Sequence, residues 1–322
     1  MCSRLLPFSH TRNQSRLRAN PSRPSIEAVA EDPGDAPQVE GFPPIADYGF
    51  VSDCEVSCLV APNGAVEWLC LPRPDSPSVF GALLDRTAGN FRFGPTNAQV
   101  PHHRRYVPGA MVLETTWHTP TGWLVVQDLL VVEPVHDGQR RSDYRRAPGD
   151  TAPTGTLLRL ATCIEGRVEI IANVVPVFEY GAAIGSWSYV GDGYNTMACA
   201  PPAGDPQLTL SSTVRLGAAG ARCYGRTTLA RGESAFAALS WGGQLTASIE
   251  QAVAQVNSTV SYWRDWLSNG TFPDHPWRSY IERSALTLKG LSYAPTGAIM
   301  AAATTSLPET PGGARNWDYR YT

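Results

Sequence analysis

Residues 56–71 read VSCLVAPNGAVEWLCL, two apolar runs separated by a short turn. The runs cover residues 56–60 and 65–71, and the turn is the tetrapeptide Ala-Pro-Asn-Gly at 61–64. Asn-Gly between two apolar runs is a strong signal for a β-hairpin, because both residues tolerate the left-handed backbone that a tight turn needs. This stretch therefore predicts two antiparallel strands.

The same arrangement recurs along the chain. The other expected strands are 112–118 and 123–132 around Thr-Pro-Thr-Gly, 157–164 and 167–175 around Glu165-Gly166, and two later strands at 208–216 and 235–241. Many strands joined by hairpins, with few helical patterns between them, favour an antiparallel arrangement packed in two layers. The sequence predicts a mainly β fold with an N-terminal antiparallel β-sandwich (a supersandwich) over residues 41–244.

The hydrophobic period changes after Trp241. Apolar side chains then recur at intervals of three and four, at Ile249, Val253, Val256, Val260, Trp263 and Leu267. This spacing places them on one face of a helix of about six turns. Asn269-Gly270 is a typical helix end. We expect a linker helix within residues 245–273.

Residues 274–322 are expected to begin a helical domain. Asp274 offers an N-cap, with Pro276 near the first helical turn. The apolar stripe of this helix is Trp277, Ile281, Ala285, Leu288 and Leu291. Residues 295–297 break the pattern, and 298–305 look extended. Because one helix cannot bury its own apolar face, we expect this domain to be incomplete.

Charge and hydropathy exclude two classes of partner. The net charge of −3 gives no basic field for nucleic acid, and no stretch of about 20 apolar residues spans a membrane. The first 40 residues read as a disordered extension, rich in Arg, Ser and Pro and then in Asp and Gly. The basic segment QRRSDYRR at 139–146 is interpreted as a solvated loop.

The chain has seven cysteines, an odd number with irregular spacing and no CxxC motif. This pattern argues against a disulfide framework and against a zinc site. It favours buried thiols in a cytoplasmic protein.

Three segments carry recognisable signatures. They are PIADYGFVSD at 44–53, GAVEWLCLPRPDSPSVFGALLD at 64–85 and TTSLPETPGGARNWDYRY at 304–321. Together they resemble glycoside hydrolase family 15, the family of glucoamylases and bacterial trehalases, over about residues 41–322. PRPDSP at 72–77 and FPDHPWR at 272–278 are most similar to the actinobacterial, mycobacterial-type trehalases.

The resemblance implies a β-sandwich, a linker helix and then an (α/α)6 barrel. It also implies an inverting mechanism, in which one carboxylic acid protonates the glycosidic oxygen and a second carboxylate activates water. Family members supply both as Glu from later barrel helices, which are absent from this sequence. We therefore expect the N-terminal portion of such an enzyme, with a truncated barrel at 274–322 and no catalytic residue.

The end of the chain lies where family members bind glucose. They continue the sequence WDYRY into a Trp-x-Arg-Asp tetrapeptide, and this chain stops at Thr322. The resemblance carries a substrate-binding role only to Trp317, Asp318, Tyr319, Arg320 and Tyr321. Packing between barrel helices is the alternative role for the aromatic residues among them.

Arg73 and Asp75 are the other candidate substrate-binding residues, since they lie in a loop after a predicted strand. This loop either reaches the barrel mouth and closes over a disaccharide, or Arg73 and Asp75 only pair with each other or cap the following turn. Glu67, Glu114 and Glu165 lie on predicted strands or turns and receive no catalytic role.

The preferred function is hydrolysis of α,α-trehalose to glucose by the full-length protein, with this portion alone inactive. Two alternatives stay open: a glucoamylase-like α-glucosidase acting on maltodextrins, and a non-catalytic β-sandwich that binds carbohydrate. The expected partner is a small-molecule sugar. The sequence shows no metal site. The resemblance leaves phosphate, Mg²⁺ and a homo-oligomer open.

Overall fold

The computed structural model describes residues 41–133, 152–202, 204, 206–242 and 245–307. The expected extension at residues 1–40 and the basic segment at 139–146 lie outside this part of the chain.

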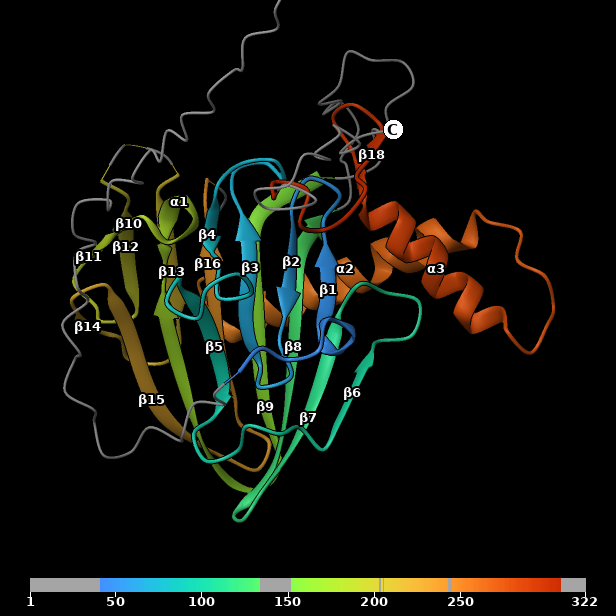
Figure 1. Cartoon of the computed structure of the whole chain (residues 1–322). Helices are drawn as coiled ribbons and strands as arrows, with labels where there is room; N and C mark the ends of the chain where they lie inside the picture. Colours follow the sequence, from blue (N-terminus) through green and yellow to red (C-terminus); the bar gives the residue numbers. More distant parts are fainter. Residues whose placement is uncertain (1–40, 134–151, 203, 205, 243–244, 308–322) are drawn as a thin grey trace, which may run out of the picture. The chain divides into compact units, whose positions relative to one another are not determined.

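The described residues form many more strands than helices (Figure 1). The strands are β1 (Gly49–Ser52), β2 (Ser57–Val60), β3 (Ala65–Cys70), β4 (Ser78–Phe80), β5 (Asn90–Pro95), β6 (His103–Tyr106), β7 (Leu113–Thr119), β8 (Gly122–Glu133), β9 (Ala152–Val175), β10 (Ala183–Ile184), β11 (Ser186–Tyr189), β12 (Thr196–Ala200), β13 (Leu208–Ser212), β14 (Gly217–Ala219), β15 (Arg222–Ala230), β16 (Ser234–Ser240), β17 (Ser292–Tyr293) and β18 (Ala298–Ile299). The helices are η1 (Ile45–Asp47), α1 (Phe178–Gly181), α2 (Ile249–Ser268) and α3 (Arg278–Gly290).

The long strand β9 is shared by two antiparallel layers. Its N-terminal half pairs with β8 and β16, in a layer ordered β6-β7-β8-β9-β16-β13-β12-β11. Its C-terminal half pairs with β5 and β15, in a layer ordered β1-β2-β3-β5-β9-β15-β14, with β4 on β3. The predicted mainly β, antiparallel sandwich is confirmed.

Two of the three predicted hairpins are present. Strands β2 and β3 pair across the Asn-Gly turn, where Asn63 Oδ1 accepts a hydrogen bond from Ala65 N at 3.0 Å. Gly64 has φ of 79°, the left-handed conformation that the turn requires. Strands β7 and β8 form the second predicted hairpin.

The third predicted hairpin, around Glu165-Gly166, is wrong. The chain continues through these residues as β9, because each half of β9 hydrogen-bonds to different neighbours instead of to the other half. Gly166 has φ of 71° and lies opposite Gly122, where an added Cβ would meet Thr121 O at 2.1 Å. The glycine therefore marks a close approach and a change of layer within one strand.

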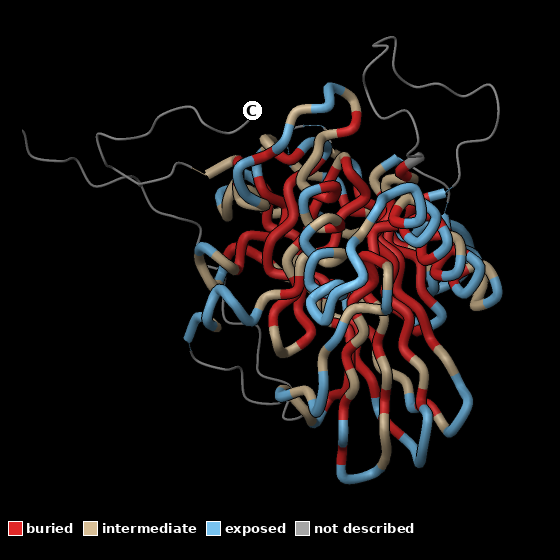
Figure 2. The backbone as a smooth tube through the Cα atoms, turned by 90° about the vertical axis from the view of Figure 1, so that its right-hand side faces the viewer, coloured by how far each residue is buried: buried red, intermediate tan, exposed pale blue. Residues whose placement is uncertain are grey.

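Apolar side chains from both layers meet in one core. Figure 2 shows the buried residues along the strands in red. Phe91 and Phe93 of β5 lie in this core with Trp117 of β7 and Leu124 of β8, and all four are fully buried. Burial of such large side chains is the main favourable contribution to folding. A second cluster lies between α2 and the outer face of the β8 layer, where Trp263 packs with Leu129 and other buried residues.

Helix α2 confirms the predicted linker helix. It spans Ile249–Ser268 and ends at Asn269, as its sequence predicts. Ser248 is its N-cap, since its side chain accepts a hydrogen bond from Gln251 N at 3.2 Å. Thr259 Oγ1 accepts a hydrogen bond from Val132 N at 3.1 Å and so ties the helix to the end of β8.

The predicted Asp274 cap of the next helix is wrong. Helix α3 begins at Arg278, with Trp277 in the N-cap position and no side-chain cap. The turn before it is stabilised by His275 Nδ1, which accepts from Trp277 N. Three residues of the predicted apolar stripe are exposed, with Trp277 at 59%, Ile281 at 38% and Leu288 at 57%. Residues 298–305, predicted as extended, form only the short β18 followed by turns.

The six cysteines within the described residues are buried free thiols, as predicted. No helix in the described part of the chain is long and apolar enough to cross a membrane.

One charged side chain is buried at the centre of the sandwich. Arg159 of β9 is fully buried, and its Nε donates to Asp128 Oδ1 of β8 at 2.8 Å. Its other nitrogens donate to the carbonyl oxygens of Phe91, at 2.6 Å, and Gly64. A buried charge is tolerated only when it is paired and hydrogen-bonded in this way.

We expect Arg159→Met to lower the free energy of unfolding by about 3–5 kcal/mol, because Asp128 would remain as a buried, unpaired charge. Urea unfolding followed by circular dichroism would measure the loss.

The matched control is Arg105→Met. Arg105 is exposed and pairs with Glu114 at 2.7 Å, so its loss should cost less than about 1 kcal/mol. Equal stability losses in the two variants would contradict the structural role of the buried pair.

Candidate functional site

The loop after β3 holds the two predicted sugar-binding residues that the structure describes. Arg73 and Asp75 form a two-pronged ion pair, with Nε to Oδ1 at 2.9 Å and Nη2 to Oδ2 at 2.7 Å. Ser76 Oγ accepts from Arg73 N at 3.2 Å. The alternative in which Arg73 and Asp75 pair with each other is thus the geometry observed.

This loop also contacts the segment that follows α3. The Arg73 guanidinium lies 6.0 Å from the ring centroid of Tyr293, within range of a cation–π contact. Arg73 remains exposed on its other side, with 55% of its side chain accessible. The loop therefore presents a fixed, accessible guanidinium at the junction of the β layers and the C-terminal segment.

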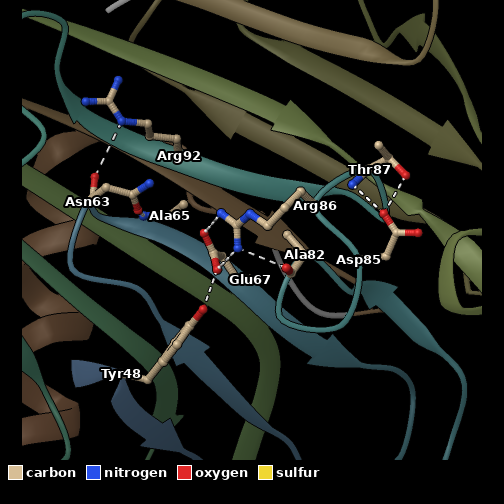
Figure 3. Close-up of polar contacts among 9 residues, drawn as sticks. All are labelled: Tyr48, Asn63, Ala65, Glu67, Ala82, Asp85, Arg86, Thr87 and Arg92. Atoms are coloured by element: carbon tan, nitrogen blue, oxygen red, sulfur yellow. Dashed lines mark hydrogen bonds and ion pairs between the residues drawn. The ribbon is translucent and has the colours of Figure 1, made fainter. Parts of the chain in front are cut away.

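A cluster of buried polar contacts surrounds Glu67, which lies inside the apolar run AVEWLC of β3 (Figure 3). Glu67 is fully buried, and both its oxygens accept hydrogen bonds from Arg86. The hydroxyl of Tyr48 donates to Glu67 Oε2 at 2.6 Å. Arg86 Nη1 also donates to Ala82 O at 2.9 Å.

The negative charge of Glu67 is balanced by the positive charge of Arg86. The hydrogen bond to Glu67 raises the pKa of Arg86 further above its usual value. Burial, and then the hydrogen bond to Glu67, raises the pKa of Tyr48, so its hydroxyl stays protonated and donating. Both oxygens of the Glu67 carboxylate are thus engaged in hydrogen bonds within the cluster.

Sequence reasoning missed this cluster, although one signal was present. Glu67 is a charged residue at a position where the strand is otherwise apolar, and such residues are almost never buried unless paired. Its partners Tyr48 and Arg86 each lie 19 residues away along the chain, so spacing alone could not connect the three.

A second buried carboxylate shapes the turn between β1 and β2. Asp53 Oδ1 accepts from Glu55 N at 2.9 Å and from Val56 N at 2.7 Å. Its Oδ2 is buried and has no hydrogen-bond partner among the described residues. Burial raises the pKa of Asp53 to about 7.

The same turn docks the end of α3. Ser52 Oγ donates to Gly290 O at 2.7 Å, and Ala294 N donates to Cys54 O at 2.7 Å. An added Cβ at Gly290 would lie 3.0 Å from the Phe50 ring and 3.2 Å from Ser52 Cβ. The β1–β2 turn therefore fixes where the chain leaves α3.

The other predicted sugar-binding residues, Trp317, Asp318, Tyr319, Arg320 and Tyr321, lie outside the described residues. Across residues 41–133, 152–202, 204, 206–242 and 245–307, no group of three or more His, Cys, Asp or Glu could hold a metal ion. Among these residues we therefore assign no binding site to Mg²⁺, the ion that the resemblance leaves open. No catalytic step is assigned to it.

Comparison with known proteins identifies the family. Residues 39–203 match the family model described as "Trehalase-like, N-terminal". The chain belongs to this family. The match begins just before the 44–53 motif and includes the hairpin β2–β3, the Arg73 loop, the Glu67 cluster and all of β9.

Full-length relatives are named as trehalases. The chain is 52% identical over 285 residues to the trehalase of Mycolicibacterium smegmatis and 50% identical over 285 residues to that of Mycobacterium tuberculosis. It is 31% identical over 277 residues to trehalase 1 of Sulfolobus acidocaldarius. The alignments cover 87%, 87% and 85% of this chain but only 43%, 42% and 42% of those proteins. The chain thus spans less than half the length of these trehalase relatives.

Among solved structures, a putative kojibiose phosphorylase from human microbiome is similar with a TM-score of 0.40 and 9% identity. This similarity covers 81% of the present chain and 36% of the phosphorylase. A likeness this low carries no argument about function.

Asp53 should make the stability of this trehalase-like domain depend on pH. Its folded pKa of about 7 lies above its ordinary value of 3.8, so the folded protein holds the proton more tightly than the unfolded chain. The contribution of protonated Asp53 to the free energy of unfolding is complete below pH 3.8 and is lost as pH rises through 7.

We expect Asp53→Asn, which keeps the Oδ1 acceptor, to reduce the difference in free energy of unfolding between pH 5 and pH 8. Urea titrations at the two pH values would measure it. Asp265→Asn, at an exposed position of α2, serves as the control and should leave the difference unchanged. If Asp53→Asn shows the same difference in free energy of unfolding between pH 5 and pH 8 as the wild type, Asp53 does not titrate in this range.

Proposed function

We propose that the chain is the N-terminal portion of a glycoside hydrolase family 15 enzyme that hydrolyses α,α-trehalose to glucose. The observation that carries the proposal is the 52% identity to the trehalase of Mycolicibacterium smegmatis over 87% of the chain. The match of residues 39–203 to the trehalase-like N-terminal model supports it.

The proposed chemistry is an inverting displacement. A carboxylic acid protonates the oxygen that links the two glucose units, while a carboxylate on the opposite face removes a proton from the attacking water. The two groups must lie about 6.5–9.5 Å apart to admit that water. We assign neither role to residues 1–322, so this portion is proposed to be inactive alone.

The proposed contribution of this chain is to bind and enclose the sugar. Arg73 and Asp75 would border the pocket, since the exposed guanidinium is paired with Asp75 and lies beside Tyr293. A guanidinium oriented by such contacts can donate to sugar hydroxyls with less loss of side-chain entropy than a free one. Residues 317–321 would supply aromatic rings for stacking and polar groups for the hydroxyls.

We propose the domain boundaries expected from the sequence: an extension at 1–40, the sandwich at 41–244, the linker helix at 245–273 and the start of the helical domain at 274–322. The exposed apolar face of α3, with Trp277, Tyr280 and Leu288, supports a helical domain that packs there. We also propose a cytoplasmic location, which the buried free thiols support.

A chimeric enzyme tests the proposed activity. The 285 aligned residues of this chain would replace their counterparts in the Mycolicibacterium smegmatis trehalase, which supplies the remaining length. We expect the chimera to release glucose from trehalose in preference to maltose, as measured by a coupled glucose assay.

Residues 1–322 alone should release no glucose from either sugar, and the parent trehalase is the positive control. Preferential release from maltose would replace the trehalase proposal with the α-glucosidase alternative. A folded but inactive chimera, together with calorimetric binding of glucan by residues 1–322, would favour the non-catalytic alternative.

Arg73→Ala in the chimera tests the loop. If Arg73 donates to a sugar hydroxyl, its removal should cost about 1.5 kcal/mol, which is about a tenfold rise in KM for trehalose. Arg105→Ala removes a similar exposed ion pair, that of Arg105 with Glu114, and should leave KM unchanged. An unchanged KM in Arg73→Ala would restrict the Arg73–Asp75 pair to shaping its own loop.

A further inference from the structure

Residues 303–306 lead into the segment with the proposed sugar-binding residues, and they are held by three side chains from the β region. Trp68 Nε1 donates to Ala303 O at 3.0 Å. Cys70 Sγ and Ser306 Oγ lie 3.3 Å apart in a hydrogen bond, and the hydroxyl of Tyr180 donates to Ser306 O at 3.4 Å. We call Trp68, Cys70 and Tyr180 the cradle.

The orientation of the two β3 members depends on a β-bulge. Strand β3 pairs with β2 so that Val66 is opposite Val60 and Trp68 is opposite Leu59, which leaves Glu67 as an extra residue. Val66 packs in the sandwich core, whereas Trp68 contacts Ala303 outside it. In a regular strand these two residues would share one face. The extra residue therefore turns Trp68 and Cys70 toward residues 303–306.

The buried cluster of Figure 3 holds this bulge in place. The Glu67 carboxylate is fixed by Arg86 and Tyr48, and its backbone carbonyl accepts from Leu83 N at 3.0 Å. Side chain and backbone of the extra residue are thus both tied to neighbouring segments. A bulge held by such contacts is a specific structural feature of the strand and not a local irregularity.

Tyr180 reaches the same place through an uncommon backbone conformation. Glu179 and Tyr180 have φ of 54° and 57°, two consecutive non-glycine residues in the left-handed region. Such residues persist only where the surroundings hold them, and they cluster at functional positions. Here the Tyr180 ring stacks on Trp68, with centroids 6.5 Å apart and planes at 28°.

The groups of the cradle are suited to positioning, because all three are neutral, Trp68 and Cys70 are buried, and Tyr180 is half-buried. Trp68 is fully buried, and Thr305 of the held segment is 4% exposed. Burial raises the pKa of Cys70 to about 12, so it remains a thiol at physiological pH. Neutral buried partners hold a backbone in one geometry without the desolvation cost of a charge.

We propose that Trp68, Cys70 and Tyr180 are positioning residues that orient residues 303–306 for sugar binding by the full-length enzyme. This role rests on the proposed trehalase function. The cradle would act on the sugar only through the held segment and would not touch the reacting atoms.

Two conservative variants separate positioning from packing. Trp68→Phe keeps an aromatic ring and removes the N–H donor, and Tyr180→Phe keeps the ring and removes the hydroxyl. Trp123→Phe is the matched control, since Trp123 of β8 stacks on His118 away from the cradle. The first measurement is hydrogen exchange of the backbone amides of residues 303–307 in the 322-residue chain.

We expect exchange in this segment to accelerate several-fold in Trp68→Phe and Tyr180→Phe and to stay at the wild-type rate in Trp123→Phe. Exchange in β3 and β9 should not change in any variant. Wild-type exchange of residues 303–307 in both cradle variants would overturn the proposal.

The second measurement is the KM and kcat for trehalose in the chimera with the same substitutions. Loss of one neutral hydrogen bond should raise KM about two- to tenfold, with a melting temperature close to that of the unsubstituted chimera. Faster exchange with unchanged KM and kcat would overturn the positioning role. It would still show that the cradle holds residues 303–306. If the unsubstituted chimera does not cleave trehalose, the proposed function and the cradle's role toward sugar both fail. The exchange data then still decide whether the cradle holds residues 303–306.

Discussion

The guanidinium of Arg159 is the interaction on which the arrangement of the two β layers depends. It joins a carboxylate on β8 to backbone carbonyls on β5 and in the β2–β3 turn, so one side chain reaches three separate segments. A charge withdrawn from water must find all of its partners at once. The apolar core alone would tolerate a shifted packing of the layers, whereas this set of hydrogen bonds is compatible with one packing.

Buried polar contacts also hold β3, the strand that leads to the candidate site. Its first end is held where Gly64 O accepts from Arg159, and its middle is held where Glu67 pairs with Arg86. Between these two fixed points the strand has little freedom to change register. The bulge at Glu67 then directs one part of β3 into the core and another toward the C-terminal segment, which connects the stability of the sandwich to the geometry of the proposed sugar site.

The features that the sequence predicted correctly depend on neighbouring residues or on a repeating hydrophobic pattern. The Asn-Gly turn at 63–64 and the stripe of α2 each lie within one continuous stretch, and both are confirmed. Glu165-Gly166 has the same local appearance as a hairpin turn, but its conformation is decided by pairing with β15 and β16, which come much later in the chain. The Glu67 cluster and the contacts of Trp68 with Ala303 join residues far apart in sequence, so no spacing rule could place them. The pairing of Arg73 with Asp75 could be foreseen because the two residues lie in one short loop.

Strand β9 has a consequence for how the domain loses its structure. Since one continuous strand provides the central hydrogen-bonding partner in both layers, neither layer can separate from the other while keeping its own ladder intact. Opening of one layer would remove the neighbour on which the other depends. The sandwich should therefore unfold as a single cooperative unit, with its last-exchanging amides in β9 and not divided between two independent sheets.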